Sequence, residues 1–434
     1  MIAVTKPTRK VYTLRRQSVA GVVAIAPVMA GLLAFGADHP VLAAMLALIQ
    51  IFGFATVALL MDPELSENLG PRARPPLALF AAALVWSVLA AGLSPSRMAS
   101  AGLEWLKLLG VASTAATLAI TCLGRHGLRA FALNLLLLSV AYTIFSLWIG
   151  QNSPYTVWGV DKGAHTYRFT GTLMNANAAG AVFATFSLIG LAPVRDMIAR
   201  TDLRTSSFTH YALLALGGGG VLVSTAACVL TGSRAALVML GLGTLAVAWR
   251  EWCRSRDRWI AAGLFLGLLA AVLASAQVAG RWSTIIDDAA QRAMILRHYL
   301  TAAAPDMLFG VGLGGFRPWN TAHLDAATAA ALWSHGAAHM ALLQAAIEGG
   351  APFALLLLAA VATMLWQILR SGANDLAIDC SLAALALLAV CSSVDIALNT
   401  PAIAALAAAI LGSAWGGALS SRRAAPQSQA APNG

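Results

Sequence analysis

Apolar residues form long runs along almost the whole chain, and short polar connections separate these runs. A helix needs about 20 apolar residues to cross a bilayer, and most of the runs are close to that length. The pattern therefore predicts an all-α integral membrane protein with about twelve transmembrane helices. The expected spans lie near 18–35, 41–61, 77–93, 103–121, 130–149, 173–192, 210–230, 235–249, 259–277, 339–369, 377–397 and 401–419.

Basic residues follow a topological rule along the same pattern. When the N-terminus is placed in the cytoplasm, nineteen of the 28 lysines and arginines fall in cytoplasmic segments, as the positive-inside rule requires. This distribution predicts a multi-pass protein of the bacterial inner membrane. Helices one to nine would occupy 1–277 and helices ten to twelve 339–419, and residues 420–434 would form a cytoplasmic polar tail.

Two connections on the expected outer side are long, at 150–171 and at 278–338. The second separates the ninth and tenth spans and contains two further helical patterns, near 287–302 and 323–333. Loops of this length are uncommon in compact proteins and are often functional. We therefore expect 278–338 to be a periplasmic loop that contributes to catalysis.

Composition limits the classes of partner. Hydrophobic residues make up 59% of the chain and charged residues only 11%, against about 25% charged in soluble domains. The net charge of +10 is spread over connections between spans, without the basic stripe and interleaved aromatics of a nucleic-acid interface. Membrane lipids are the expected surroundings, and no nucleic acid is expected. The five cysteines form no CxxC pair and the outer side has no DxD motif, so we expect no metal site and no cofactor.

Several arginines lie on the outer side, against the general charge bias. Guanidinium groups match phosphate oxygens in a bidentate geometry, so such a group of arginines indicates an anionic ligand. The alternative is that they are solvated loop charges or contacts to lipid headgroups. The arginines that we single out as donor-binding candidates are Arg168, Arg234, Arg292 and Arg297.

Short motifs surround these arginines. Residues 168–180 read RFTGTLMNANAAG, where Asn175 and Asn177 are candidates to cap the following helix. Residues 230–235 read LTGSRA, and the sequence GVGLGGF at 310–316 predicts a tight turn rather than a dinucleotide site, because no strand precedes it. His339 then begins the segment HMALLQAAIEGGAP, which contains Gln344 and Glu348.

In their order along the chain these motifs resemble the O-antigen ligase and polymerase superfamily, which are membrane glycosyltransferases of the GT-C type. The resemblance covers about 168–355. It implies transfer of a glycan from undecaprenyl diphosphate to a hydroxyl group at the periplasmic face. A ligase would use lipid A core as the acceptor and a polymerase would use a second carrier-linked repeat; the short tail favours the ligase. The chain departs from the family pattern at Met340, where asparagine is common, and at Ala176, where proline is common.

The resemblance and the residue chemistry together assign expected roles. His339 is the expected catalytic base, because histidine titrates near neutral pH, with His335 and His298 as alternatives. The four arginines would hold the diphosphate in place of a metal ion. Supporting roles are expected for Asn175, Asn177, Gln344 and Glu348.

Ionisable residues within spans are costly in lipid and are usually paired or functional. We expect Glu104 to pair with Lys107, one helical turn away, and leave open whether Asp395 contacts the arginines or has no role. The rival classes are a flippase for lipid-linked glycans and a secondary transporter. A secondary transporter would show two related halves with broken helices, and no internal repeat is visible in this sequence.

Overall fold

The computed structural model describes residues 9–60, 63–93, 95–123, 125–201, 206–254, 285–325, 328–333 and 335–421. These residues form helices joined by turns, together with one small antiparallel hairpin of strands β1 (Thr156–Val157) and β2 (Val160–Asp161). The helices of the first half are α1 (Arg9–Leu33), α2 (Pro40–Leu60), α3 (Pro63–Gly92), α4 (Pro95–Thr121), α5 (Arg125–Asn152), α6 (Ala176–Ala199), α7 (Phe208–Thr231) and α8 (Arg234–Arg254). Those of the second half are α11 (Ile285–Ala303), α12 (Phe316–Ala322), α13 (Ala329–Leu332), α14 (Ala341–Gly349), α15 (Ala351–Arg370), α16 (Leu376–Val394) and α17 (Pro401–Ser421). Short 3-10 turns are η1 (Phe35–Ala37), η2 (Gly163–His165), η4 (Ala304–Asp306) and η5 (Ala397–Asn399).

Ten of the described helices are long and apolar enough to cross a membrane, so the chain is a multi-pass, all-α membrane protein. They are α2 to α8 and α15 to α17, and each corresponds to an expected span. Helix α1 contributes a shorter apolar stretch, Val19–Leu33. The expected span 259–277 lies outside the described residues.

Two expectations about the second half were wrong in detail. The span expected over 339–369 is two helices, α14 and α15, because Gly350 interrupts it with a φ of +85°. With nine residues, α14 is too short to cross a bilayer, and only α15 qualifies as a span. The helix expected over 323–333 is also wrong: α12 ends at Ala322, and α13 covers only Ala329–Leu332. The helix expected near 287–302 is confirmed by α11.

Helices α6 and α17 form the centre of the bundle, and almost all of their spanning residues are buried. Helix α17 packs closely on α4 because Gly412 and Gly416 face the backbone of Ala115 and Ala119. A Cβ atom at either glycine would lie 2.1 or 2.2 Å from a carbonyl oxygen of α4. Two glycines spaced by four residues are a common basis of helix contact in membranes, where close packing replaces the hydrophobic effect.

An expected ion pair within a span is confirmed. Lys107 Nζ lies 2.5 Å from Glu104 Oε1, one turn earlier on α4. Pairing lowers the cost of placing both charges among apolar helices.

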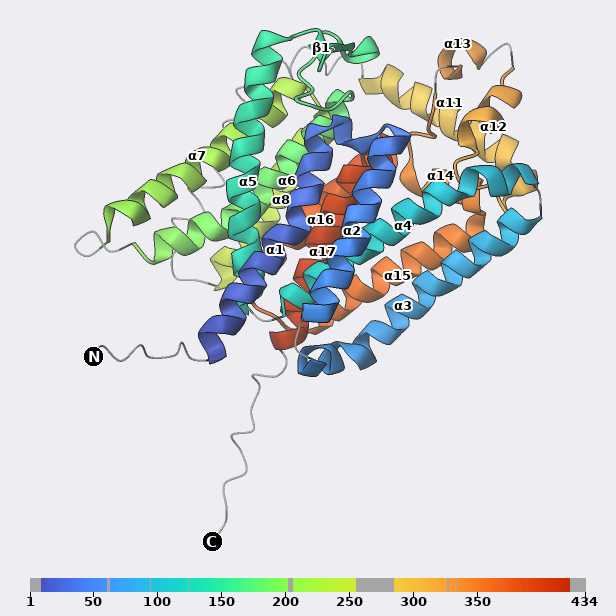
Figure 1. Cartoon of the computed structure of the whole chain (residues 1–434). Coiled ribbons are helices and arrows are strands. Elements are labelled where there is room, and N and C mark those ends of the chain that lie inside the picture. Colours follow the sequence, from blue (N-terminus) through green and yellow to red (C-terminus); the bar gives the residue numbers. More distant parts are fainter. Residues whose placement is uncertain are drawn as a thin grey trace.

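The segment between α11 and α14 has a hydrophobic cluster of its own, separate from the main core. Tyr299 of α11, Phe316 and Trp319 of α12, and Leu343 and Ile347 of α14 are its main buried side chains. In Figure 1 these helices lie at the same end of the bundle as the β1–β2 hairpin, whereas α1 begins and α17 ends at the opposite end. This cluster packs α11, α12 and α14 against one another at this end of the bundle.

Candidate functional site

His339 occupies an unusual position where the chain enters α14. Its φ of +55° is in the left-handed region, which residues with a side chain rarely adopt. Such a conformation costs on the order of 1–3 kcal/mol and persists only where the surroundings hold it. The backbone N–H of the preceding residue, Ala338, donates to Gln344 Oε1 at 2.8 Å. Gln344 therefore fixes the backbone that presents the His339 ring.

The His339 ring faces Asp395, whose Oδ1 lies 3.5 Å from His339 Nδ1. Asp395 directly follows α16, where its extended backbone ends the helix, and it is 7% exposed. Burial would raise the pKa of Asp395, but the His339 ring, the Ile396 amide and the Asn177 side chain more than offset this and leave the pKa below its ordinary value. Asp395 is therefore a buried carboxylate that stays ionised beside the expected base.

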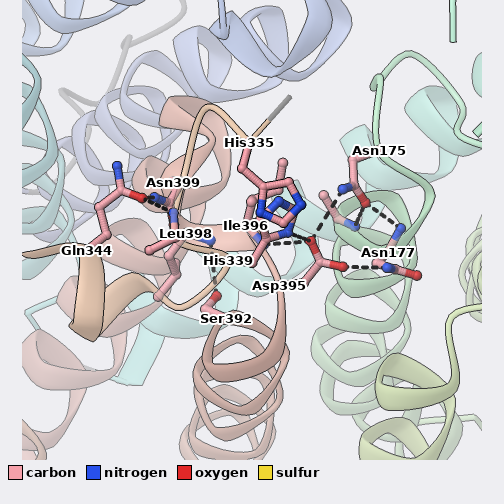
Figure 2. A network of polar contacts seen from close by, with 12 residues as sticks. Asn175, Asn177, His335, His339, Gln344, Ser392, Asp395, Ile396, Leu398 and Asn399 are labelled. Carbon is pink, nitrogen blue, oxygen red and sulfur yellow. Dashed lines mark hydrogen bonds and ion pairs between the residues drawn. The ribbon is translucent and has the colours of Figure 1, made fainter. Parts of the chain in front are cut away.

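Two asparagines of the first motif complete the surroundings of Asp395 (Figure 2). Asn175 caps α6 as expected, because its Oδ1 accepts from the N–H of Asn177 at 2.7 Å and of Ala178 at 3.0 Å. Its Nδ2 donates to Asp395 Oδ1 at 3.3 Å. Asn177 does not cap the helix; it lies in the first turn and donates from Nδ2 to the other carboxylate oxygen.

Arg168 joins this network through Asn177. Its guanidinium donates from NH2 to Asn177 Oδ1 at 2.7 Å and from Nε to the Thr231 carbonyl at 2.9 Å. A continuous chain of polar contacts thus runs from Arg168 through Asn177 and Asp395 to His339. The arginine, the asparagine and the histidine were predicted to belong to one site, and the structure brings them together.

Arg234 lies close to the same helix end. It begins α8 directly after a turn in which Gly232 has a φ of +62°, and this turn packs on Gly180 of α6. A Cβ atom at Gly180 would lie 2.6 Å from Ser233 Cβ, so the LTGSRA turn is in direct contact with the first turns of α6. The turn thereby lies beside the helix that carries Asn177.

Arg292 and Arg297 are not part of the network in the structure. Both are exposed residues of α11, and α11 approaches the site through Tyr299 instead. Tyr299 Oη lies 3.4 Å from His335 Nδ1 and belongs to the buried cluster of the loop. The His298 ring lies 5.5 Å from the Tyr299 ring, centroid to centroid, at an interplanar angle of 58°, and it makes no described contact with His339 or Asp395.

His335 is the alternative histidine that does reach the site. Its ring lies 4.5 Å from the His339 ring, centroid to centroid. Burial and the neighbouring His339 lower the pKa of His335 to about 4, although Asp395 acts in the opposite direction. His335 is therefore neutral at neutral pH, and its ring packs on one face of His339.

The two supporting residues of α14 act on the backbone around the site. Besides Ala338, Gln344 Oε1 accepts from Asn399 Nδ2 at 2.8 Å, and its Nε2 donates to Glu348 Oε1 at 3.1 Å. Glu348 Oε1 also accepts from the N–H of Phe316 at 3.3 Å, at the start of α12. Glu348 does not contact His339; it joins the loop to α14. Burial and the nearby Glu104 raise the pKa of Glu348 to about 7.

The GVGLGG segment forms the tight turn that was expected. It lies against the break between α14 and α15, where Val311 N–H donates to the Ile347 carbonyl at 2.8 Å and Gly312 N–H to the Glu348 carbonyl at 2.9 Å. At Gly310, with a φ of +72°, a Cβ atom would lie 2.2 Å from the Glu348 carbonyl oxygen. The glycine allows backbone to pack directly on backbone, which ties the loop to α14.

Asp395 and Asn399 are the members of the network that the sequence did not assign. A signal existed for Asp395, because it is an ionisable residue at the end of a span. No sequence pattern pointed to Asn399 or Tyr299. Among the described residues, no group of three or more His, Cys, Asp and Glu side chains is arranged to hold a metal ion.

Fold and site together define a multi-pass helical membrane protein that has a buried carboxylate, a partly exposed histidine paired with it, and an arginine at one end of its bundle. Comparisons of the chain with protein-family models and with curated proteins found no match.

Proposed function

We propose that this chain is a glycosyltransferase of the GT-C type that transfers O-antigen glycan from undecaprenyl diphosphate to lipid A core. This is the activity of an O-antigen ligase in lipopolysaccharide biosynthesis, at the periplasmic face of the inner membrane. The observation that carries the proposal is the contact chain from Arg168 through Asn177 and Asp395 to His339. It joins a candidate phosphate ligand to a candidate base by residues from three separate segments.

The histidine–carboxylate pair supports a general-base role. With Nδ1–H directed to Asp395, the imidazole keeps its Nε2 lone pair for an acceptor hydroxyl group. His339 takes the hydroxyl proton while the hydroxyl oxygen forms a bond to the anomeric carbon of the donor sugar. The bond between that carbon and the diphosphate oxygen breaks, and the bonding electrons leave with the lipid diphosphate. Ionised Asp395 stabilises the imidazolium that results.

The arginines supply the charge that the leaving group requires. A lipid diphosphate gains negative charge as its bond to the sugar breaks, and guanidinium groups stabilise such charge through bidentate contacts. Arg168 is held by Asn177 and the Thr231 carbonyl, so its position is set before a donor arrives. Arg234 would approach from the adjacent turn, and Arg292 and Arg297 from α11.

The place of the site in the bundle suits lipid-anchored substrates. Asn175 and Asp395 flank the ends of two spanning helices, α6 and α16, so the reacting groups lie at the level of a membrane surface. A carrier lipid and a lipid A core molecule, each anchored in the outer leaflet, would meet there without leaving the membrane.

The experiment that tests the proposal is a transfer assay with purified protein in liposomes that contain carrier-linked glycan. One reaction offers lipid A core as acceptor, and a second offers another carrier-linked repeat. We expect transfer to lipid A core, and its loss by 10²-fold or more in His339→Ala and His339→Gln, because a positioned base contributes about 10²–10⁴-fold. His39→Gln, a change at an exposed histidine outside the site, is the matched control.

Each outcome separates the candidate functions. Transfer only to the second carrier would identify a polymerase and refute the ligase assignment. Movement of carrier-linked glycan across the liposome membrane without transfer to either acceptor would identify a flippase. Near-native turnover in His339→Gln would contradict the role of His339 as the base.

A further inference from the structure

A second polar site lies at the other end of the same helices. A cavity of about 400 Å³ opens where α6 and α8 end and where α5, α7 and α16 begin. Asp375, which precedes α16, lines this cavity, whereas Asp395 of the candidate active site follows α16. The 19 residues of α16 separate the two carboxylates by about 28 Å, at 1.5 Å per residue. The cavity is therefore distinct from the site around His339.

Charged side chains form much of the cavity wall. Four arginines and three carboxylates line it, and His210 adds a further titratable group. Asp379, outside the lining, pairs with Arg254 and with Arg250, so the whole group holds five arginines against four carboxylates and keeps an excess of positive charge. The arginines of the lining are Arg129, Arg195, Arg200 and Arg254. Positive charge that exceeds its partners in a concave site between spanning helices attracts anions.

The carboxylates are already held by partners from the protein. Glu251 pairs with Arg195 at 2.6 Å and with Arg254 at 3.4 Å. Asp375 caps α16 by accepting from the Ala377 N–H at 3.0 Å. The acidic groups thus serve to fix the arginines in place, and they do not form a cation site.

Several guanidinium groups at this cavity have only long ion pairs or have N–H donors without a partner among the described residues. Arg129 is half-exposed, and its two ion pairs, to Asp196 and Asp375, are long at 3.4 and 3.6 Å. Arg254 Nε is buried and, among the described residues, has no hydrogen-bond partner. Arg200 is exposed and makes no described side-chain contact. A buried donor without a partner is costly, so a ligand or water that accepts from it would stabilise the site.

Apart from Asn374, the remaining wall is apolar, with Leu133, Pro193 and Leu376 among its residues. A cavity lined by both arginines and apolar side chains fits a phosphate group attached to a hydrophobic or neutral body. We propose that this cavity binds a phosphate-bearing anion on the side of the membrane opposite His339. Two sources share this chemistry: the headgroup of an anionic phospholipid and a small soluble phosphate compound.

The test uses the full-length protein and two ligands. Native mass spectrometry measures retention of phosphatidylglycerol after purification from nanodiscs that contain phosphatidylglycerol and phosphatidylcholine. Isothermal titration calorimetry in detergent measures binding of inorganic pyrophosphate. The variants are Arg200→Gln, which removes no described contact, and Arg129→Gln/Arg200→Gln. The matched control is Arg74→Gln, an exposed arginine at the same expected membrane side and outside the cavity lining.

We expect the wild type to bind one of the two ligands, and Arg74→Gln to bind the same ligand with the same affinity. Each arginine lost from the cavity should weaken that binding by about ten- to a hundredfold, as removal of a charge-assisted hydrogen bond does. Selective retention of phosphatidylglycerol would support the lipid source, and pyrophosphate binding without lipid retention the soluble source. Absence of both, or equal binding by the wild type and the double variant, would overturn the proposal.

Discussion

Asp395→Asn is the change that most directly tests how the site works. The carboxylate accepts from Asn175, Asn177 and the Ile396 N–H, and it faces Nδ1 of His339. Asparagine has the same shape but one acceptor oxygen, so one of these donors would face an NH2 group. The substitution removes both the charge beside His339 and part of the support for Asn177.

The expected size of the effect follows from these contacts. A hydrogen bond to a charged group contributes about 1.5–3 kcal/mol. If that contact is made more strongly in the transition state, its loss lowers kcat by about ten- to a hundredfold. Because Asn177 also holds Arg168, we expect a smaller rise in KM for the carrier-linked donor.

The liposome transfer assay measures kcat and KM for wild type, Asp395→Asn and a matched control at the other end of the same helix. Asp379→Asn is that control, because Asp379 is similarly buried and is also engaged by charged partners, Arg250 and Arg254. Asp379→Asn should lower Tm but leave turnover per folded molecule unchanged. Equal losses of kcat in the two variants would show that the effect is general destabilisation, and native kcat in Asp395→Asn would refute its role beside His339.

Four further predictions concern topology, metal dependence, phosphate binding and stability. In intact spheroplasts, Asp325→Cys should label with an impermeant maleimide and Ser255→Cys should not; the reverse result would invert the topology. Transfer should continue in excess EDTA, and loss of turnover rescued by Mg²⁺ or Mn²⁺ would contradict metal independence. Replacement of Arg168, Arg234 or Arg292 by alanine should lower turnover by about ten- to a hundredfold, with partial rescue by lysine, since lysine lacks the bidentate fork; unchanged turnover in all three variants would remove this role from them. The pKa of Glu348 is raised from 4.5 to about 7, so between these pH values the folded state keeps a proton that the unfolded state releases. Tm should therefore fall as pH rises from about 4.5 to 7. Glu348→Gln should flatten this dependence of Tm on pH, and an unchanged slope would contradict the raised pKa of Glu348.

The spans were the part of the fold that the sequence predicted best. Their apolar length follows directly from bilayer thickness, so α2 to α8, α16 and α17 were expected from the length of the apolar runs alone. The division between α14 and α15 was not, because apolar residues continue through it. Gly350 ends α14 only in combination with the loop, whose Gly310 and Leu308 carbonyl pack on that point. That contact joins residues 40 positions apart, so the local sequence pattern around Gly350 does not predict it.

The site was predicted in part, for a comparable reason. Arg168, Asn177 and His339 carry motif signals, but the sequence does not tell which side chains meet. The role of Asp395 was left open, because its neighbours come from α6 and from the loop, more than 50 residues away. Arg292 and Arg297 show the opposite case: they follow the charge pattern of a binding loop, yet lie exposed on α11 away from the network. Their expected role rests on the charge pattern and the resemblance, and no contact in the described residues joins them to the network.

The arrangement of polar residues on α6 and α16 explains why polar side chains gather at each end of these helices. Both helices are mostly apolar along their length, since charged groups are costly in lipid. Their charged and amide side chains lie near the ends, with Asn175 and Asp395 at one end and Asp196 and Asp375 at the other. Because α6 and α16 pack side by side, the polar residues of the two helices meet at both ends. The same constraint that makes the spans easy to recognise thus gathers the reactive groups into two clusters, one around His339 and one around the arginine-lined cavity.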